Sequence, residues 1–498
     1  MSQAQRGQNK SGYLSEDTIA AITAPPGGAV SIIRVSGPLA LTVLEKLSGQ
    51  DIRSKQTPRK LFKSIIRDGD GTALDDALIA YFVAPASFTG EDCVEFNLHG
   101  SPLIATRVLE ALQSHGVRQA LAGEFSFRAV RNGKINLTQA QATADLIGAS
   151  NDGAIALALE KMSGTQANLI SSLADELRKL AVLGEIGIDF ADQDVDEVSL
   201  PNLKLRVNGI LKKLLHLKQS YSRGTMIQEG IKVAFVGLPN AGKSSFFNAL
   251  LGEDRSIVSD IAGTTRDVVR EKLTLQGYTS SVTLRLEDTA GLRNLRARAA
   301  SESETSPGSV DNRPSYGSDH DTIEMIGIER TLKAAREADL ILLLVDAQAN
   351  QDAVTSLTEE WRRLGEPRDR TLGVITKMDL GMSEVLRDPA TLAAFGLQMW
   401  QQTSAVCSDG ISEAASAIAD FCEKWVRREK GEVLLTRLDH LRSVEDAMDH
   451  LERGEQALEI DLFASDVRQA LFALDPLIGE TVPDDILGRI FSEFCIGK

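Results

Sequence analysis

The sequence of 498 residues predicts a multidomain protein: an N-terminal α+β domain, then a helical domain into which a doubly wound α/β domain is inserted. Three observations predict this arrangement. The first segment alternates apolar and polar residues in the manner of strands. Leucine stripes at helical spacing occur both before residue 226 and after residue 424. Between them, a glycine-rich loop follows a short apolar run that begins at Ile231.

The composition is that of an ordinary globular chain, with 43% hydrophobic and 25% charged residues. The net charge of −16 makes the chain a poor non-specific binder of nucleic acid, so any such contact must be local or shared with a partner. The 4 cysteines form no CxxC pair, which favours a reducing compartment and excludes a structural zinc site of that type. No apolar run approaches about 18 residues, so we expect a cytoplasmic, soluble protein with no membrane attachment.

Residues 1–15 are polar and are expected to form a disordered leader. Residues 16–131 form the predicted α+β domain, with strands at 31–35, 76–82 and 93–98 and a helix at 102–114. Arg34 and Glu95 occupy strand positions in it. Their side chains could face solvent or line a pocket, and the residues alone favour solvent.

Helical patterning fills residues 132–226 and resumes at 425–498, so the segment 227–424 between them is interpreted as an inserted domain. We interpret the apolar stripes as the core of a helix bundle. The stripes are Leu169, Leu173, Leu177 and Leu180; Leu203, Val207, Ile210, Leu214 and Leu217; Leu438, Leu441, Val444, Met448 and Leu451; and Leu471, Leu474 and Leu477.

The inserted segment opens with GLPNAGKS at 237–244, which matches the phosphate-binding pattern GxxxxGK[ST]. A strand before the loop and a helix at 244–251 argue against a glycine-rich turn that matches by chance. In this pattern, backbone N–H groups cradle the β-phosphate, Lys243 reaches the β and γ oxygens, and the hydroxyl of Ser244 holds Mg²⁺.

Further nucleotide-binding motifs follow in order. GTTRD at 263–267 supplies Thr265 for the Mg²⁺ shell, and DTAG at 288–291 supplies Asp288 behind the metal. TKMD at 376–379 offers the Asp379 carboxylate to two guanine N–H groups, which selects GTP over ATP, while the segment 403–405 backs the base. The residues expected to contact GTP are Asn240, Ala241, Gly242, Lys243, Ser244, Ser245, Ser259, Asp260, Ile261, Ala262, Gly263, Thr264, Thr265, Asp288, Thr289, Ala290, Gly291, Thr376, Lys377, Met378, Asp379, Ser404, Ala405 and Val406.

Two features depart from common GTPases. Leu292 stands where Ras-type enzymes place a water-orienting glutamine, so another residue, an ion or a partner must take that task. Residues 294–322 are rich in Ser, Asp, Glu and Pro and predict a disordered insertion in the loop that senses the γ-phosphate.

Several stretches together resemble the MnmE/TrmE family of tRNA-modification GTPases. They are DTIAAITAPPG at 17–27, IIRVSG at 32–37, SFTGEDCVEF at 87–96, the segment 122–147, GTTRD at 263–267 and FCIGK at 494–498. The resemblance covers nearly the whole chain, and the pairing of GTTRD with a C-terminal CIGK is specific to that family. Thr376 departs from its NKxD motif, and we expect this replacement of Asn to weaken guanine affinity while Asp379 keeps base selectivity.

The resemblance implies that the N-terminal domain binds a 5-formyl- or 5,10-methylene-tetrahydrofolate and forms a homodimer. Arg34, Glu95 and Lys134 match folate-binding positions, and Lys498 lies near the folate. This implication reverses the solvent-facing interpretation of Arg34 and Glu95. Folate carries a glutamate tail for a cation and a donor edge for a carboxylate.

The resemblance also implies a K⁺ ion in place of the missing glutamine and arginine finger. Asn240 supplies a side-chain oxygen, and the backbone carbonyls of Ser259, Ile261 and Thr264 complete the cage. Glu324 matches the glutamate that positions the attacking water, although without the resemblance a solvated helix charge is the simpler interpretation. Cys495 matches the family thiol, for which a buried apolar role remains the alternative.

The implied function is K⁺-dependent GTP hydrolysis that drives modification of wobble uridine 34 in tRNA. An aminomethyl or carboxymethylaminomethyl group is added at C5 with a folate one-carbon unit and a flavoprotein partner, MnmG/GidA, in a heterotetramer. The alternative from the nucleotide motifs is a regulatory GTPase that assembles ribosomal particles without modification activity. The Arg34, Glu95 and Lys134 set favours modification, because a pure switch needs no folate pocket.

Overall fold

The computed structural model of the chain describes residues 13, 16–189, 199–253, 271–277, 281–286, 332–429, 431–478, 484–492, 494 and 497. They form two compact units. The first comprises Met1–Ala144, Lys161–Lys212 and Arg442–Lys498, and the second comprises Asp145–Glu160 and Lys213–Leu441. The domain limits expected at residues 131, 226 and 424 stay predictions.

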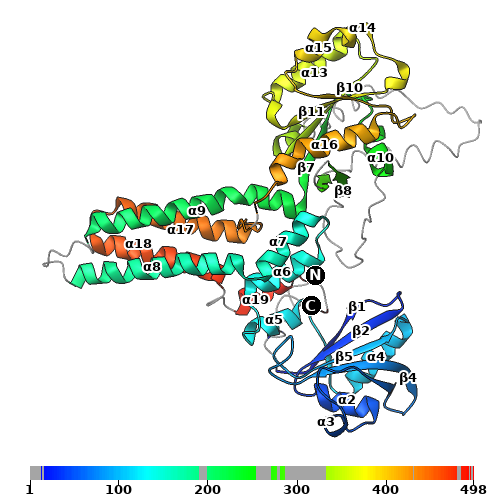
Figure 1. The fold of residues 1–498 in the computed structure, drawn as a ribbon, viewed down its shortest axis with the longest axis vertical. Coiled ribbons are helices and arrows are strands. Elements are labelled where there is room, and N and C mark those ends of the chain that lie inside the picture. Colours follow the sequence, from blue (N-terminus) through cyan, green and yellow to red (C-terminus); the bar gives the residue numbers. More distant parts are fainter. Residues whose placement is uncertain are drawn as a thin grey trace, which may run out of the picture. The chain divides into compact units, whose positions relative to one another are not determined.

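The first unit contains a mixed sheet with the strand order β3-β4-β5-β2-β1-β6 (Figure 1). Neighbouring strands are antiparallel except for the parallel pair β1 and β6. The strands and the helix expected between residues 31 and 114 are confirmed. The elements are β1 (Ile19–Ala24), β2 (Val30–Ser36), α2 (Ala40–Ser48), α3 (Ile52–Lys55), β3 (Phe62–Arg67), β4 (Ala73–Phe82), β5 (Cys93–His99), α4 (Pro102–Ser114) and β6 (Arg118–Gln119).

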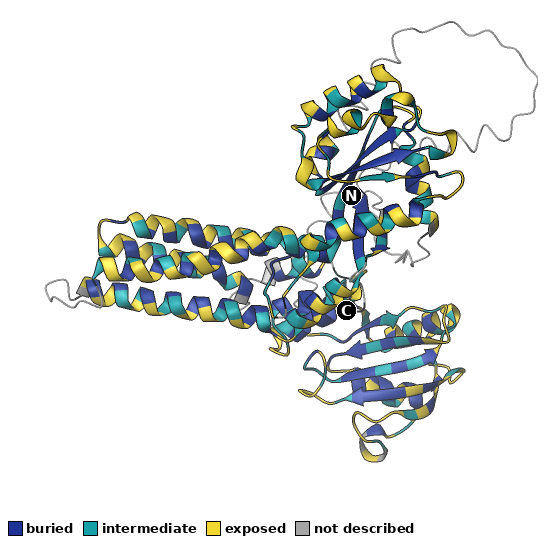
Figure 2. Ribbon diagram, turned by 45° about the horizontal axis from the view of Figure 1, so that its top comes forward, coloured by how far each residue is buried: buried dark blue, intermediate teal, exposed yellow. Residues whose placement is uncertain are grey.

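One face of this sheet is packed against α2 and α4. Ile33, Phe96 and Ile79 lie side by side on β2, β5 and β4, and each is fully buried in that core. Because side chains alternate between the faces of a strand, the next residues along, Arg34 and Glu95, lie on the opposite face. Figure 2 shows this alternation of buried and less buried residues along the strands.

The helices outside the two sheet regions belong in part to the first unit and in part to the second. They are α5 (Glu124–Arg131), α6 (Leu137–Ile147), α7 (Asp152–Met162), α8 (Thr165–Asp189), α9 (Leu200–Glu229), α17 (Leu438–Gln456), α18 (Ile460–Ile478) and α19 (Asp484–Phe491). Helices α8 and α18 lie side by side (Figure 1). Gly184 permits their close contact, because a Cβ there would lie 2.9 Å from Ala464 Cβ.

The apolar stripe is buried at every member on α9, whereas the stripes of α8, α17 and α18 each contain one half-buried leucine, namely Leu169, Leu441 and Leu471. All five stripe residues of α9 and the stripe residues Leu173, Leu177 and Leu180 of α8 are buried. The stripe on α17 is wrong at its first member: Leu438 is the first residue of the helix and is 50% exposed. Tyr13, which falls in the predicted leader, is half-buried and packs against Phe127.

The second unit contains a sheet with the order β12-β11-β10-β7-β9-β8, in which only the β8–β9 pair is antiparallel. Its core packs against α10 and α16 on one face and α13 on the other. The predicted doubly wound architecture is therefore confirmed. The elements are β7 (Ile231–Val236), α10 (Lys243–Glu253), β8 (Glu271–Gln276), β9 (Ser281–Leu286), β10 (Leu340–Asp346), α13 (Gln351–Arg363), η4 (Arg368–Arg370), β11 (Thr371–Thr376), η5 (Met378–Leu380), α14 (Glu384–Arg387), α15 (Pro389–Ala393), β12 (Trp400–Gln402) and α16 (Ile411–Val426).

No helix in the described part of the chain is both long enough and apolar enough to cross a membrane.

Candidate functional site

The phosphate-binding loop connects the buried strand β7 to helix α10. Two of its residues adopt a left-handed conformation, Asn240 with φ 63° and Gly242 with φ 78°. Gly237 lies against β10, because a Cβ there would be 2.5 Å from the carbonyl oxygen of Leu344. The loop therefore needs glycine at its base for close packing and again at its end for the backbone turn.

Lys243 begins helix α10, and its ammonium group lies over the loop that precedes it. Nζ donates hydrogen bonds to the carbonyl oxygens of Gly237 at 2.6 Å and Leu238 at 2.9 Å. Burial lowers the pKa of Lys243, and the nearby charge of Glu360 partly opposes this shift. The ammonium is thus held where phosphate oxygens can replace the loop carbonyls as its acceptors. Ser244 follows it in the first turn of α10, where its hydroxyl oxygen suits a hard cation such as Mg²⁺.

The residues expected to bind the base meet at the ends of β11 and β12. The hydroxyl of Ser404 donates a 2.6 Å hydrogen bond to Oδ1 of Asp379. The backbone N–H of Met378 donates to the carbonyl oxygen of Thr403 at 3.1 Å. These two bonds bring the TKMD segment and the 403–405 segment together and set the direction of the Asp379 carboxylate.

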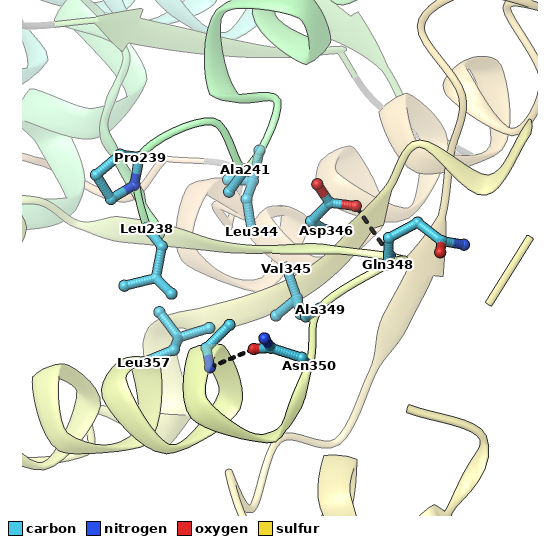
Figure 3. Close-up of a pocket in the computed structure, with 11 residues that line it drawn as sticks. Leu238, Pro239, Ala241, Leu344, Val345, Asp346, Gln348, Ala349, Asn350 and Leu357 are labelled. Atoms are coloured by element: carbon cyan, nitrogen blue, oxygen red, sulfur yellow. Dashed lines mark hydrogen bonds between the residues drawn. The ribbon is translucent and has the colours of Figure 1, made fainter. Parts of the chain in front are cut away.

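Lys377 lies in a left-handed conformation with φ 57° and reaches the end of β10, where its Nζ is 2.7 Å from Oδ2 of Asp346. Gln348, which follows β10, donates hydrogen bonds to the carbonyl oxygens of Leu380 and Gly381, directly after the TKMD segment. Pro239 of the loop, Leu344 of β10 and Leu357 of α13 are among the residues that line a pocket of about 250 Å³ (Figure 3). The end of β10 thus supports both the phosphate-binding loop and the base-binding segments.

The side chain of Thr376, the first residue of the TKMD segment, is buried and forms hydrogen bonds within the protein. Its hydroxyl donates to the carbonyl oxygen of Ala241 at 2.8 Å, and the carbonyl oxygen of Val345 lies at 3.2 Å. The three elements that meet here are the phosphate-binding loop, β10 and β11.

A second candidate site lies in the first unit, on the sheet face opposite α2 and α4. Arg34 and Glu95 are direct partners across β2 and β5. Nε and Nη2 of Arg34 both reach Oε1 of Glu95, at 2.9 and 2.8 Å. The guanidinium also lies over two aromatic rings, 5.3 Å from the centre of Phe88 and 5.7 Å from that of Phe125.

Lys134 approaches the same region through the loop 83–92. Its Nζ donates to the carbonyl oxygen of Pro85 at 2.8 Å, and its stem lies against Gly90. Phe88, from this same loop, stacks on Arg34. The loop therefore contacts both Arg34 and Lys134, and Glu95 joins this set through its ion pair with Arg34.

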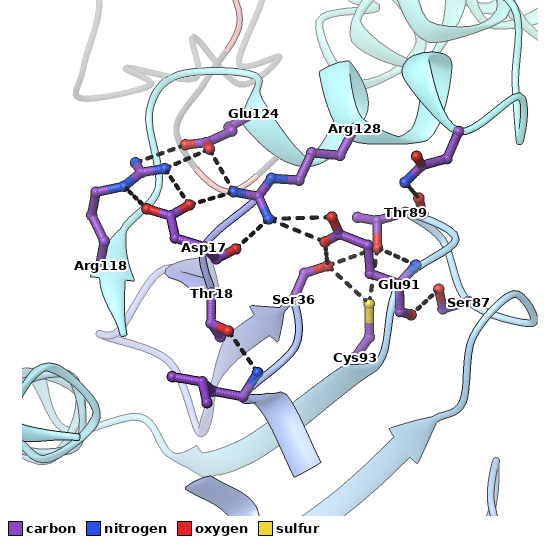
Figure 4. A network of polar contacts seen from close by, with 12 residues as sticks. Asp17, Thr18, Ser36, Ser87, Thr89, Glu91, Cys93, Arg118, Glu124 and Arg128 are labelled. Atoms are coloured by element: carbon purple, nitrogen blue, oxygen red, sulfur yellow. Dashed lines mark hydrogen bonds and ion pairs between the residues drawn. The ribbon is translucent and has the colours of Figure 1, made fainter. Parts of the chain in front are cut away.

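A buried polar network holds the loop 83–92 and was not anticipated from the sequence (Figure 4). Glu124 is fully buried and accepts hydrogen bonds from Arg118 at 2.8 Å and from Arg128 at 3.0 Å. Arg128 also contacts Asp17 at 2.9 Å and Glu91 at 3.2 Å. Within this network only Glu124 and Arg128 are linked by a local pattern, the i,i+4 spacing on α5. Asp17, Glu91 and Arg118 come from separate segments, and the sequence does not indicate that they meet there.

Some of the predicted site residues lie outside the described residues. These are Ser259, Asp260, Ile261, Ala262, Gly263, Thr264, Thr265, Asp288, Thr289, Ala290, Gly291, Glu324, Cys495 and Lys498, together with Leu292 and the insertion 294–322.

Comparisons with known proteins cover the whole of this architecture. The family model described as "GTP-binding protein TrmE N-terminus" matches residues 18–134, and "MnmE helical domain" matches residues 137–495. A tRNA modification GTPase MnmE of Histophilus somni is 37% identical over 97% of this chain and 100% of its own length. One from Sodalis glossinidius is 36% identical over 97% and 99% of the two chains.

The matched models together extend over both units and include the segment that carries the phosphate-binding loop and the TKMD motif. The full-length relatives match at an identity well above the level at which only the fold is shared. The chain belongs to the MnmE family of tRNA modification GTPases.

Proposed function

We propose that this GTP hydrolase uses K⁺-dependent GTP hydrolysis to drive addition of a carboxymethylaminomethyl group to C5 of wobble uridine 34 in tRNA. The relatives named tRNA modification GTPase supply the substrate class. The binding and hydrolysis of GTP are supported by two features of the second unit. Lys243 lies over the phosphate-binding loop, and Ser404 orients the carboxylate of Asp379.

Two metal ions belong to this proposal. Ser244 and Thr265 would hold Mg²⁺ through their hydroxyl oxygens. Asn240 would hold K⁺, together with the carbonyls of Ser259, Ile261 and Thr264. In support, Asn240 is exposed at the tip of the loop, and a side-chain amide oxygen suits a hard cation. A bound cation would neutralise the charge that develops between the β- and γ-phosphates.

The catalytic roles are assigned by family likeness. Glu324 would orient the attacking water, since Leu292 cannot hydrogen-bond to it. Lys243 would stabilise charge on the phosphates. Cys495 would act in the one-carbon transfer, where a thiolate is the reactive form.

The Arg34–Glu95 pair is the proposed site for a 5-formyl- or 5,10-methylene-tetrahydrofolate. Both contacts from Arg34 go to Oε1 of Glu95, which leaves Oε2 available for the donor edge of a pterin. The rings of Phe88 and Phe125 add flat apolar surface beside the pair. Lys134 and Lys498 would contribute positive charge for the glutamate tail.

The same sheet face supports the proposed homodimer. Strand register places Val30, Ile65 and Leu78 on the face that carries Arg34 and Glu95. These apolar side chains are 54%, 44% and 47% exposed. An exposed apolar face around polar groups is typical of an interface between protein copies.

The flavoprotein MnmG/GidA is the proposed partner in the modification, in a heterotetramer. At a net charge of −16, this chain is poorly suited to hold tRNA by general electrostatic attraction. We therefore assign most of the tRNA binding to the complex of the two proteins.

Titration with 5-formyl-tetrahydrofolate tests the folate part. Wild-type protein should bind it saturably, and Glu95→Lys should abolish binding because the carboxylate becomes a second cation beside Arg34. Glu110→Lys, an exposed charge reversal on α4 away from this face, is the matched control and should bind normally. Nucleoside analysis of tRNA from cells that carry only Glu95→Lys should show unmodified wobble uridine. No saturable binding, together with unchanged nucleosides, would favour an assembly GTPase.

A further inference from the structure

Thr376 occupies the motif position at which an amide side chain is usual. The side chain is 4% exposed, so it is packed inside the domain. Its backbone carbonyl oxygen accepts a hydrogen bond from the N–H of Ala347 at 2.9 Å, which fixes the residue to the end of β10.

The hydroxyl of Thr376 is directed at the phosphate-binding loop. It lies 2.8 Å from the carbonyl oxygen of Ala241 and 3.2 Å from that of Val345. A hydroxyl has one proton to donate, and the shorter distance is the usual length of an O–H···O hydrogen bond. The bond to Ala241 is therefore the principal one.

The next residue of the loop touches the same side chain. A Cβ on Gly242 would lie 3.2 Å from Oγ1 and 3.3 Å from Cβ of Thr376. Thr376 thus packs on Gly242 and bonds to Ala241, and these two residues directly precede Lys243.

This contact falls between two residues of the loop with left-handed backbone. Asn240 and Gly242 on either side of Ala241 both have positive φ. The N–H of Ala241 donates to the carbonyl of Leu238 at 3.1 Å, and its carbonyl accepts the hydrogen bond from Thr376, so both backbone groups of Ala241 are bonded. A loop that binds phosphate through backbone N–H groups gains affinity when those groups are already oriented.

We infer that Thr376 is a positioning residue that ties the phosphate-binding loop to β11 and thereby strengthens phosphate binding, while the base is read by Asp379. The inference rests on the proposed binding of GTP at this loop. It changes the expected consequence of the Asn-to-Thr replacement: the hydroxyl is used within the protein and gives no contact to guanine.

Nucleotide binding by two variants tests the inference. Thr376→Val keeps the shape and removes the hydroxyl, whereas Thr376→Ser keeps the hydroxyl and removes a methyl group. Equilibrium affinity should be measured for GTP, 7-deaza-GTP and 6-thio-GTP, because a donor that reads guanine would use N7 or O6. We expect Thr376→Val to weaken all three by one common factor of about tenfold, and Thr376→Ser to stay within about twofold of wild type.

Hydrogen exchange of the nucleotide-free protein gives a second measurement. In Thr376→Val, exchange should accelerate in residues 237–242 and stay unchanged in β1. If Thr376→Val fails to fold, the comparison of Thr376→Ser with Thr376→Ala replaces it, with the same expectation for the variant that lacks the hydroxyl.

Three results would overturn the inference. They are unchanged GTP affinity in the variant without a hydroxyl, an equal loss in Thr376→Ser, or a loss for GTP that is absent for one analogue. The last result would make Thr376 a base reader. Failure of wild-type protein to bind GTP would instead refute the proposed function, so the two failures are distinguishable.

Discussion

The hydroxyl of Ser404 donates a 2.6 Å hydrogen bond to the carboxylate of Asp379, although 25 positions separate the two residues. Ser404 is itself fixed, because its N–H donates to the carbonyl of Asp409 at 2.8 Å. An ionised carboxylate that must accept two N–H bonds from a planar base benefits from a fixed orientation. The serine therefore holds the Asp379 carboxylate in one orientation within the folded protein.

Replacement of Ser404 by alanine should weaken GTP binding. Loss of a hydrogen bond to a charged group costs about 1.5–3 kcal/mol, so we expect GTP affinity to fall by at least roughly tenfold. Ser412→Ala, an exposed serine on α16, is the matched control. Equilibrium titration with a fluorescent GTP analogue measures both. Equal affinities in the two variants would mean that Asp379 needs no orienting partner.

The cation requirement can be tested at Asn240. Wild-type protein should hydrolyse GTP much faster in K⁺ than in Na⁺, and Asn240→Ala should lose that difference because the loop no longer offers its amide oxygen. Phosphate release in matched potassium and sodium buffers is the measurement. Asn350→Ala, which removes an amide at the start of α13, should keep the preference for K⁺. Identical wild-type rates in both salts would exclude a K⁺ requirement.

The buried network around Glu124 should contribute far more stability than an exposed ion pair. Glu124→Ala leaves the charges of Arg118 and Arg128 without their buried acceptor, and loss of one partner in such a site costs about 3–5 kcal/mol. Asp76→Ala breaks the exposed pair with Lys63 and should cost less than about 1 kcal/mol.

Hydrogen exchange in β1 and α5 is the appropriate measurement for this pair of variants. The three tryptophans, Trp361, Trp400 and Trp425, all lie in the second unit, so their fluorescence does not report on the network. Similar exchange in Glu124→Ala and Asp76→Ala would contradict the expected difference.

Tyr13 should make stability depend on alkaline pH. Burial, aided by the charge of Glu124, raises its pKa from 10.0 to about 12. The folded state therefore keeps the phenolic proton where the unfolded state has lost it. The stabilisation is fully present below pH 10.0 and is lost as the pH rises from there to about 12.

Tyr13→Phe removes the titrating group and the 2.7 Å hydrogen bond to the carbonyl of Ala122 while keeping the ring. Ultraviolet difference spectra should show that wild-type protein has one additional tyrosine, absent from the variant, that ionises about two pH units above the ordinary value. An ordinary ionisation for that tyrosine would show that Tyr13 is not held against Ala122.

Asn151 joins three elements in the second unit. Its Oδ1 accepts the N–H of Ala154 at 2.7 Å, and its Nδ2 donates to Thr283 Oγ1 at 3.0 Å and to the carbonyl of Ile227 at 3.2 Å. Asn151→Asp keeps the acceptor at the start of α7 and removes both donated bonds. Asn151→Ala removes all three.

Hydrogen exchange should separate these roles. Exchange at the start of α7 should accelerate only in Asn151→Ala, because loss of a helix-capping acceptor costs about 1 kcal/mol. Exchange around Thr283 in β9 should accelerate in both variants. Equal protection of α7 in the alanine variant would show that the cap contributes nothing there.

The sequence by itself determined most of the architecture, and local spacing is the reason. The phosphate-binding loop, the buried runs of β10 and β11, and the stripes of α8 and α9 each report on neighbours within one element. The alternation of apolar and polar residues placed Arg34 and Glu95 on predicted strands, but it could not decide between solvent and pocket, and only the structure pairs the two residues. Leu438 continues a helical stripe in sequence, yet it lies at the first residue of its helix and is exposed.

Tertiary structure alone decided the contacts between distant segments. From the sequence, Thr376 was expected to weaken the contact with guanine. Only the fold brings its hydroxyl to Ala241, which lies 135 positions away. Asp17 and Arg128 are likewise 111 positions apart, yet they meet in one buried network. Spacing along the chain carries no information about such pairs, because the packing of whole elements, and no local periodicity, sets the distance between them.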